Sequence, residues 1–543
     1  MGKRSKKKRG PSQSARGEQP AAPMSKPVAQ LTPPTQPAPA IAANSAPFSA
    51  MFIFRVLLII GAVFWIYGPV LHGDWLWDDD TLISENDVVH DPFGLINIWF
   101  APTSLIDYFP LTVSVDWLEW QFWGGNTFPY HLTNLILHAI SSLLVWRLLS
   151  KLGLRLAWLG GLLFAIHPVT VESVAWMAEL KNTLSMPPFL LAACAWIDYE
   201  RRGNLEDYCR ALVFFLVAML CKSSMVNFPV AILLYAWWRR DRVTSRNLVE
   251  SAPFFAISLA IGLTLIALLR HGVGEQFIPL GGVLSRLACG GLSLSFYFSK
   301  CVLPLNLLPI YPQWDINPPT LVQFLPWPVI GIALFWLWTR HTAWARNVLF
   351  GFGFFLVMLV PFVGFRPISF MRFAWVMDHF LYLPILGLLA LAVAALGQLD
   401  DRVGATKRPY LIAAVAALFV VLAVGSHRYA KVYVNSEKLW SYTCQHDPEA
   451  WPAFNNLGNV YLHDNRLPEA EKEFIAALIL NPKYAEAQNN LGVVYLRTGR
   501  LNEALKQFYI ALELQPDLGS ALQNSAELED YFKAHPLERQ PRR

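Results

Sequence analysis

Three adjacent carboxylates follow the first apolar stretch of the chain. Asp78, Asp79 and Asp80 lie in the run GDWLWDDDTLISEND at residues 73–87, behind two tryptophans of the kind that favour a membrane–water boundary. A carboxylate there can act as a general base towards a hydroxyl or help to hold a divalent cation such as Mg²⁺ or Mn²⁺. We expect Asp78 and Asp79 to be catalytic and Asp80 to cap a helix that begins near Thr81. A solvated turn is the alternative.

A second set of polar residues lies at the ends of other apolar segments. Most of them are lysines, arginines or histidines, whose positive charge can stabilise a departing phosphate. The set consists of His167, Glu172, Lys181, Lys222, Lys300, Arg366, Arg372 and His379. Two alternatives stay open: His167 and Glu172 would pin the end of a helix, and Lys222 and Lys300 would extend to the membrane surface. A metal site from His131 and His138 is a weaker hypothesis.

The composition indicates a multi-pass membrane protein. Of 543 residues, 54% are hydrophobic and only 15% are charged, which is more apolar surface than a soluble fold of this length hides. The six cysteines show no paired spacing, so neither a disulfide framework nor a zinc site is predicted. Nothing indicates a nucleic-acid partner.

The basic charge is confined to the N-terminus. Residues 1–46 hold eight Lys and Arg and one Glu, a net charge of +7, against +5 for the whole chain. Because this segment is rich in Pro, Ala and Gln, we predict a disordered tail. By the positive-inside rule it stays in the cytoplasm, where it can also contact anionic membrane lipids.

Eleven apolar segments are predicted to be membrane helices. They lie at about 51–70, 131–149, 157–170, 184–198, 210–222, 225–238, 252–270, 320–338, 347–363, 379–397 and 409–426. The ends that would face the cytoplasm, at 151–155, 200–210, 238–246, 339–346 and 401–408, are all basic. A further apolar run at 284–305 is interpreted as re-entrant or interfacial. The membrane domain is therefore predicted at 47–430, with residues 71–130 as its first extracytoplasmic loop.

Within that loop, the stretch SVDWLEWQFWGG suggests an amphipathic helix in the membrane interface. Trp117, Trp120 and Trp123 recur every three residues, with Asp116 and Glu119 between them. An aromatic stripe of this kind is typical of a membrane anchor.

The strongest pattern lies in the C-terminal region. Residues 455–482 and 489–516 superpose at a period of 34, with Gly458/Gly492 and Phe474/Phe508 in register. This period is typical of tetratricopeptide repeats, helix–turn–helix units that stack into a solenoid. We predict an extracytoplasmic repeat domain at 431–543, with repeats near 451–484 and 485–518 and a partial third at 519–535.

The order of these motifs resembles the transmembrane and tetratricopeptide repeat-containing family, in particular its bacterial members. WDDDTLISEN, HPVTVESVAW, CKSSMVNFP and DHFLYLP carry the resemblance, which covers about residues 70–520. It implies an all-α protein with a GT-C membrane domain of about eleven spans, placed in a bacterial inner membrane. It also implies O-mannosyltransferase activity with a polyprenyl-phosphate mannose donor. By position, Asp78 and Asp79 match the family's acidic pair, His167 and Glu172 its HP…E motif, and Lys181 the basic position that follows.

Two functions remain open. Activated sugars outside the cytoplasm come from lipid carriers, so carboxylates and cations on one face favour a membrane glycosyltransferase. Such an enzyme would move a sugar, mannose by analogy, from a polyprenyl-phosphate donor to a protein hydroxyl that the repeats present. The alternative is a non-catalytic scaffold whose repeats recruit partners, which Leu180 favours because relatives usually carry arginine there. A transporter is less favoured, because the ionisable residues lie at span ends rather than mid-bilayer.

Overall fold

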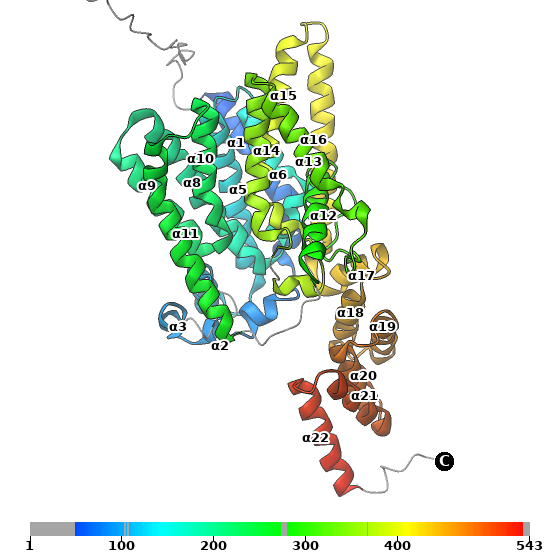
Figure 1. Ribbon diagram of the computed structural model, residues 1–543. Helices are drawn as coiled ribbons and strands as arrows, with labels where there is room; N and C mark the ends of the chain where they lie inside the picture. The colour runs from blue at the N-terminus through cyan, green and yellow to red at the C-terminus, as the bar shows by residue number, and fades with distance from the viewer. Residues whose placement is uncertain (1–48, 102–104, 106–107, 273–279, 366–367, 536–543) are drawn as a thin grey trace, which may run out of the picture. The chain divides into compact units, whose positions relative to one another are not determined.

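The computed structural model describes residues 49–101, 105, 108–272, 280–365 and 368–535. These residues form helices and connecting turns, with no strand among them (Figure 1). The basic tail predicted at 1–46 lies outside this part of the chain.

All eleven apolar segments predicted from the sequence are helices. They are α1 (Ala50–Tyr67), α5 (Thr127–Lys151), α6 (Ala157–Ile166), α8 (Leu180–Arg202), α9 (Leu205–Cys221), α10 (Phe228–Arg240), α11 (Ser245–Gly272), α13 (Pro326–Thr339), α14 (Ala343–Leu359), α15 (Ile385–Arg402) and α16 (Arg408–Ala430). Among the described residues, six helices are long and apolar enough to cross a membrane, or seven if the bent pair 157–166 and 168–175 forms one span. The helical nature of the segments is confirmed, while eleven crossings stay a prediction.

Helix α8 shows why some segments are shorter or more polar than a lipid-facing span. It carries Pro187 and Pro188 in its interior, and most of its first eighteen residues are buried. A helix surrounded by protein needs no continuous apolar surface of membrane length, because its neighbours cover it.

Helix α12 (Val283–Val302) covers the run that we interpret as re-entrant or interfacial. Near its start, Arg286 donates to the carbonyl of Phe365, just beyond α14. Near its end, the carbonyl of Cys301 lies 3.1 Å from Nε2 of His167, just beyond α6. Both ends of α12 thus contact segments that follow a bundle helix, α14 at one end and α6 at the other. If α6 and α14 run in the same direction, as the predicted topology has them, both ends of α12 lie on the same side of the bundle, as expected for a helix that does not cross it.

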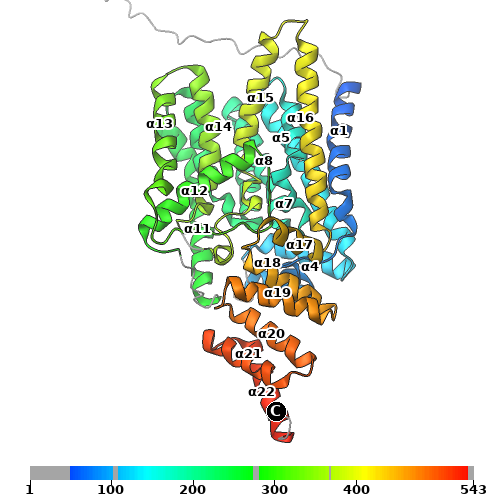
Figure 2. The same ribbon diagram turned by 90° about the vertical axis from the view of Figure 1, so that its right-hand side faces the viewer.

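The predicted cytoplasmic ends meet at one end of the bundle. Their ion pairs join Lys151 to Asp198 at 2.5 Å, Arg346 to Asp241 at 3.6 Å, Arg155 to Asp400 and Asp401, and Arg240 to Glu200. The turns between α13 and α14 and between α15 and α16 lie at this end, away from the C-terminal helices (Figure 2). The loops that charge patterning assigns to one side of the membrane therefore share one end of the fold.

Short elements gather at the other end. From the first loop come η1 (Gly68–His72), η2 (Asp80–Ser84), α2 (Asp87–His90), α3 (Gly94–Phe100) and α4 (Pro110–Trp123). From later connections come η4 (Pro168–Thr170), α7 (Val171–Ala175), η5 (Met177–Glu179), η6 (Ser223–Asn227), η7 (Leu321–Phe324), η8 (Val360–Phe362), η9 (Ser369–Arg372) and η10 (Asp378–Leu381). Three of the predicted site residues, Glu172, Arg372 and His379, lie in these elements. Three more, Asp79, His167 and Lys222, directly precede η2, η4 and η6.

The C-terminal region has the predicted repeat architecture. After η11 (Lys431–Val434) and α17 (Ser436–His446), the repeats are α18 (Trp451–His463) with α19 (Leu467–Leu480), α20 (Ala485–Arg497) with α21 (Leu501–Leu514), and the single helix α22 (Gly519–Ala534). A Cβ on Gly458 or Gly492 would lie 2.7 or 2.6 Å from the ring of Phe474 or Phe508, respectively. Only glycine allows this close packing of the two helices in each repeat.

The two ends of the bundle can be assigned to membrane sides by cysteine labelling. We expect a membrane-impermeant maleimide applied to intact cells to modify Asp80→Cys and Lys483→Cys. These exposed positions lie in the first loop and in the repeats. Native Cys209, which is exposed near the start of α9, should react only after permeabilisation. Each site is tested with the other cysteines replaced, and labelling of positions 80 and 483 on opposite sides would contradict the topology.

Candidate active site

Asp79 is a buried anchor at the end of the first apolar helix. Its side chain has no solvent exposure and accepts hydrogen bonds from the backbone N–H of Leu76 at 2.8 Å and of Ala178 at 2.7 Å. Burial raises the pKa of the Asp79 carboxyl well above its usual value, although both backbone hydrogen bonds oppose the shift. The Asp79 side chain therefore ties the first loop to the segment before α8.

Asp78 and Asp80 point elsewhere. Both are exposed, and Asp80 accepts a hydrogen bond from the hydroxyl of Ser84 at 3.0 Å. Element η2 begins at Asp80 and has no side-chain cap, so the prediction that Asp80 caps this helix is wrong. Of the two aspartates predicted to be catalytic, only Asp78 is open to a substrate in this structure.

A buried charge network lies beyond Ala178. The Glu172 carboxylate accepts a hydrogen bond from the backbone N–H of His379 at 3.1 Å and lies 2.9 Å from Nδ1 of the His379 ring. Nε2 of the His379 ring lies 3.8 Å from Glu179. Glu179 in turn pairs with Lys181 at 3.2 Å and with Lys222 at 3.9 Å. The structure thus brings Glu172 and Lys181 together with Lys222 and His379, which lie far from them in the sequence.

Asn182 completes this network. Its amide oxygen accepts a hydrogen bond from Nζ of Lys222 at 2.6 Å, and its amide nitrogen donates to Glu179. The Lys222 ammonium also lies 5.8 Å from the centre of the Phe380 ring. These contacts hold the lysine in the protein interior, so the alternative in which Lys222 extends to the membrane surface is wrong.

His167 and Lys300 have structural contacts instead. Nδ1 of His167 accepts from the N–H of Val169 at 3.3 Å, which makes His167 the N-cap of η4 and confirms its role in pinning the end of a helix. Lys300 donates to the carbonyls of Leu305 at 2.7 Å and Asn306 at 2.9 Å. In the described part of the chain neither residue contacts the Glu179 network, and the role of both in phosphate binding stays a prediction.

Of the two predicted arginines, Arg366 lies outside the described residues. Arg372 is half-buried and pairs with Glu486 of the second repeat at 3.5 Å. Its guanidinium also lies 4.5 Å from the centre of the Phe373 ring. Arg372 therefore stands between the membrane domain and the repeats.

Helix α4 contributes two carboxylates that the sequence analysis assigned to a membrane anchor. Asp116 and Glu119 are buried, and Glu119 accepts a hydrogen bond from Thr133 at 2.5 Å. Burial raises the pKa of both groups, of Glu119 to about 7. The charge of Glu119 raises the pKa of Asp116 further, whereas the charge of Lys181 lowers it. The spacing of Thr112, Asp116 and Glu119 by four and three residues indicates one helix face, and this signal was overlooked in favour of the tryptophans.

The carboxylates of the described residues are not arranged as a typical metal site. Among the described residues, no group of three or more His, Cys, Asp or Glu side chains is arranged to hold a metal ion. Both oxygens of Asp79 already accept backbone hydrogen bonds, so Asp78 and Asp79 do not fit a shared Mg²⁺ or Mn²⁺. His138 bonds to Tyr382 at 2.8 Å and lies 3.3 Å from the carbonyl of Ala165, which gives it no ligand role with His131.

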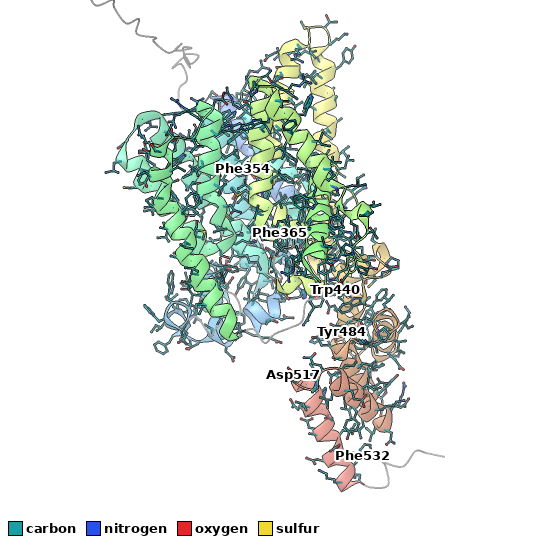
Figure 3. The ribbon with its side chains drawn as sticks, in the orientation of Figure 1. Phe354, Phe365, Trp440, Tyr484, Asp517 and Phe532 are labelled. Carbon is teal, nitrogen blue, oxygen red and sulfur yellow. The ribbon has the colours of Figure 1, made fainter. Side chains whose placement is uncertain are left out.

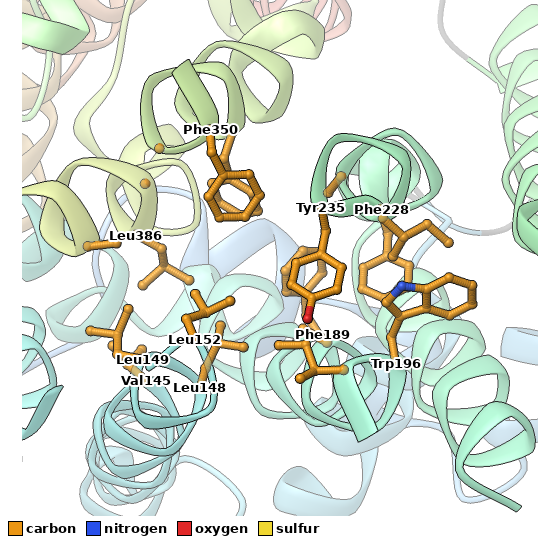
Figure 4. Close-up of a pocket in the computed structure, with 18 residues that line it drawn as sticks. Val145, Leu148, Leu149, Leu152, Phe189, Trp196, Phe228, Tyr235, Phe350 and Leu386 are labelled. Carbon is orange, nitrogen blue, oxygen red and sulfur yellow. The ribbon is translucent and has the colours of Figure 1, made fainter. Parts of the chain in front are cut away.

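An apolar pocket between α5, α8, α10, α14 and α15 is not the reaction site. Figure 4 shows side chains from these helices around it, and the labelled ones include Val145, Leu149, Phe189, Tyr235, Phe350 and Leu386. No carboxylate, lysine or arginine is among its lining residues, so it offers no acid–base chemistry.

Comparison with known proteins shows which proteins this chain resembles. Residues 112–269 match the family model described as dolichyl-phosphate-mannose-protein mannosyltransferase, and residues 455–518 match a tetratricopeptide repeat model. Protein O-mannosyl-transferase F38B6.6 of Caenorhabditis elegans is 24% identical over 472 residues, covering 80% of this chain and 64% of the relative.

Two human proteins show the same similarity. Protein O-mannosyl-transferase TMTC1 of Homo sapiens is 26% identical over 500 residues, covering 79% of this chain and 55% of that protein. Protein O-mannosyl-transferase TMTC4 of Homo sapiens is 25% identical over 440 residues, which cover 68% of this chain and 58% of that protein. The chain thus spans between about half and two thirds of the length of the curated relatives it matches. The resemblance to the transmembrane and tetratricopeptide repeat-containing family is confirmed.

The network predicts a large loss of stability on Glu179→Gln. This change removes the carboxylate that Lys181 and Lys222 share inside the protein, and breaking a buried ion pair in this way costs about 3–5 kcal/mol. Thermal unfolding in detergent should show a clear drop in Tm. The control is Glu206→Gln, which breaks an exposed pair with Arg210 and should cost at most about 1 kcal/mol. Equal shifts in the two variants would refute the structural importance of the network.

Glu119 predicts a pH dependence of stability. Because burial raises its pKa in the folded protein to about 7, the folded state binds a proton that the unfolded state releases near pH 4.5. Stability should therefore decrease from about pH 4.5 to 7, by up to about 3 kcal/mol. Thermal unfolding at pH 5 and pH 8 should show a larger decrease in Tm for the wild type than for Glu119→Gln. Identical pH dependence in both proteins would contradict the assignment.

Proposed function

We propose that this chain, as a relative of protein O-mannosyl-transferases, is a membrane glycosyltransferase that moves mannose from a polyprenyl-phosphate carrier to a protein hydroxyl. One observation carries the proposal. The stretch matched by the mannosyltransferase family model, residues 112–269, includes the acidic face of α4 and the members Glu172, Glu179, Lys181 and Lys222 of the buried network. The matched stretch therefore carries Glu179 and the two lysines that pair with it, while Asp78 and Asp79 precede the stretch.

Asp78 is the group we assign to the acceptor. A protein hydroxyl is a poor nucleophile at neutral pH and needs a base to take its proton as the bond to the sugar forms. Asp78 is exposed at the end of the first apolar helix, whereas both oxygens of its neighbour Asp79 accept backbone hydrogen bonds. In this proposal Asp78 receives the proton, and Asp79 holds the loop in place.

Lys181 and Lys222 are the groups we assign to the donor. When the sugar leaves a polyprenyl phosphate, the negative charge on the phosphate needs a nearby cation. Both lysines are held by Glu179, and Lys181 is the more exposed of the two, with 19% of its side chain accessible against 6% for Lys222. Lys181 would meet the phosphate, while Lys222 would stabilise the network behind it.

The second candidate function is a membrane scaffold that recruits partners through its repeats. Two observations favour it. Leu180 stands where the resemblance to the family leads us to expect an arginine, and Glu179 already balances the charges of Lys181 and Lys222. A scaffold would bind partners through residues 436–534 and show no turnover of any lipid-linked sugar.

Donor turnover by purified protein separates the two functions. Full-length protein in detergent is incubated with radiolabelled polyprenyl-phosphate mannose, with and without an acceptor protein, and release of the sugar is measured. We expect Asp78→Asn to lower kcat at least about a hundredfold, the usual scale for a lost general base, with a smaller change in Tm than Asp79→Asn because the Asp78 side chain is exposed. Asp79→Asn should lower both activity and Tm.

The matched control is Asp80→Asn, an exposed aspartate in the same run whose hydroxyl partner Ser84 lies within its own helix. It should keep nearly full turnover. Full activity of Asp78→Asn would refute the assigned base. An inactive wild type with every polyprenyl-phosphate sugar, combined with partner binding by the repeats, would establish the scaffold instead.

A further inference from the structure

The segment that carries the aspartates is held from two sides. On one side, the indole N–H of Trp176 donates to the carbonyl of Leu76 at 3.2 Å, next to the bond between Ala178 and Asp79. On the other side, the carbonyl of Val434 in η11 accepts a hydrogen bond from the N–H of Asp74, and the hydroxyl of Ser436, the first residue of α17, donates to the carbonyl of Trp75. The second side leads directly into the repeats.

Trp77 lies between these two sides in an uncommon backbone conformation. Its φ is +47°, in the left-handed region that a bulky side chain rarely adopts. Such a conformation persists only where the surroundings determine it. Residue 77 directly precedes Asp78 and Asp79, so its backbone angles decide which way these two side chains point.

Three aromatic rings hold Trp77. Its indole stacks on Trp176, with ring centres 5.2 Å apart and planes at 7°. Trp440 of α17 packs against it at 5.1 Å and 71°, and Phe373 lies at 6.3 Å. Trp440 is 2% exposed and lies close to where the C-terminal helices leave the bundle (Figure 3). The packing around Trp77 therefore includes one residue from the repeat side of the molecule.

We propose that Trp440 is a positioning residue for the Asp78–Asp79 pair. By packing against Trp77 and pressing it onto Trp176, it maintains the turn that directs Asp79 inward to the N–H groups and leaves Asp78 outside. This inference rests on the proposed function where it concerns catalysis. It makes the region after α16 a part of the catalytic unit, in addition to any role in presenting the acceptor.

The Asp79 hydrogen bonds give a direct readout of this role. Hydrogen exchange of the peptides that contain Leu76 and Ala178 is measured by mass spectrometry in full-length protein, since both N–H groups donate to Asp79. We expect at least tenfold faster exchange of both peptides in Trp440→Leu, which keeps an apolar side chain but loses the ring, and in Trp440→Ala. Trp440→Phe should restore most of the protection.

Trp451→Ala is the matched control. Trp451 is also a tryptophan on this side of the molecule, but its ring contacts are with Phe373 at 6.1 Å and Tyr484 at 4.5 Å. Its replacement should leave the exchange of the Leu76 and Ala178 peptides unchanged. Unaltered exchange in Trp440→Leu, or equal acceleration in Trp451→Ala, would overturn the proposal.

Donor hydrolysis tests the link to catalysis: without an acceptor protein, water takes the place of the acceptor hydroxyl, and Asp78 would receive its proton. Trp440→Leu should lower kcat at least tenfold with little change in the KM for the donor. The same change introduced into Asp78→Asn should cause no further loss, because a residue that acts only through Asp78 has nothing left to position. If the losses of kcat in the two single variants multiply in the double variant, the positioning role is overturned. An inactive wild type would refute the proposed function alone, and the exchange rates would then decide the role of Trp440.

Discussion

Ionised groups inside an apolar helix bundle persist only when each has a partner of opposite charge or a set of hydrogen bonds. Here that constraint falls on Glu179, which balances Lys181 and Lys222 and lies beside His379. Satisfying it requires η5, the start of α8, the end of α9 and η10 to meet at one point. The arrangement of this end of the bundle follows from that requirement, because moving any of these elements would leave a charge buried without its partner.

At the opposite end of the bundle, the charged side chains depend less on their partners. The pairs there are partly exposed, as with Arg155, whose side chain is 49% accessible in its contacts with Asp400 and Asp401. Exposed pairs of this kind contribute little to stability, and their excess of Lys and Arg matters for orientation in the membrane. At the end that contains Arg155, charge therefore bears on orientation in the membrane. At the end that contains Glu179, charge positions individual side chains, and this is the end where we propose the chemistry.

The sequence predicted the features that depend on local patterns. Apolar composition identified the eleven helical segments, and the period of 34 identified the repeats. The bonds of His167 to Cys301 and of Lys300 to Leu305 and Asn306 could not be predicted, because their partners are backbone carbonyls whose positions depend on the final fold. The different environments of Asp78 and Asp79 depend on the left-handed turn at Trp77, which no propensity favours for tryptophan.

The connection between the bundle and the repeats is too short to be a flexible tether. Helix α16 ends at Ala430, η11 follows at once, and a single residue, Asn435, separates η11 from α17. The Asn435 side chain caps the N-terminus of α17 by accepting a hydrogen bond from the N–H of Lys438 at 2.9 Å. The same few residues bond to the backbone of Asp74 and Trp75. A rotation of α17 relative to the bundle would break these bonds and withdraw Trp440 from Trp77, so the orientation of α17 and the geometry of the aspartate loop are coupled.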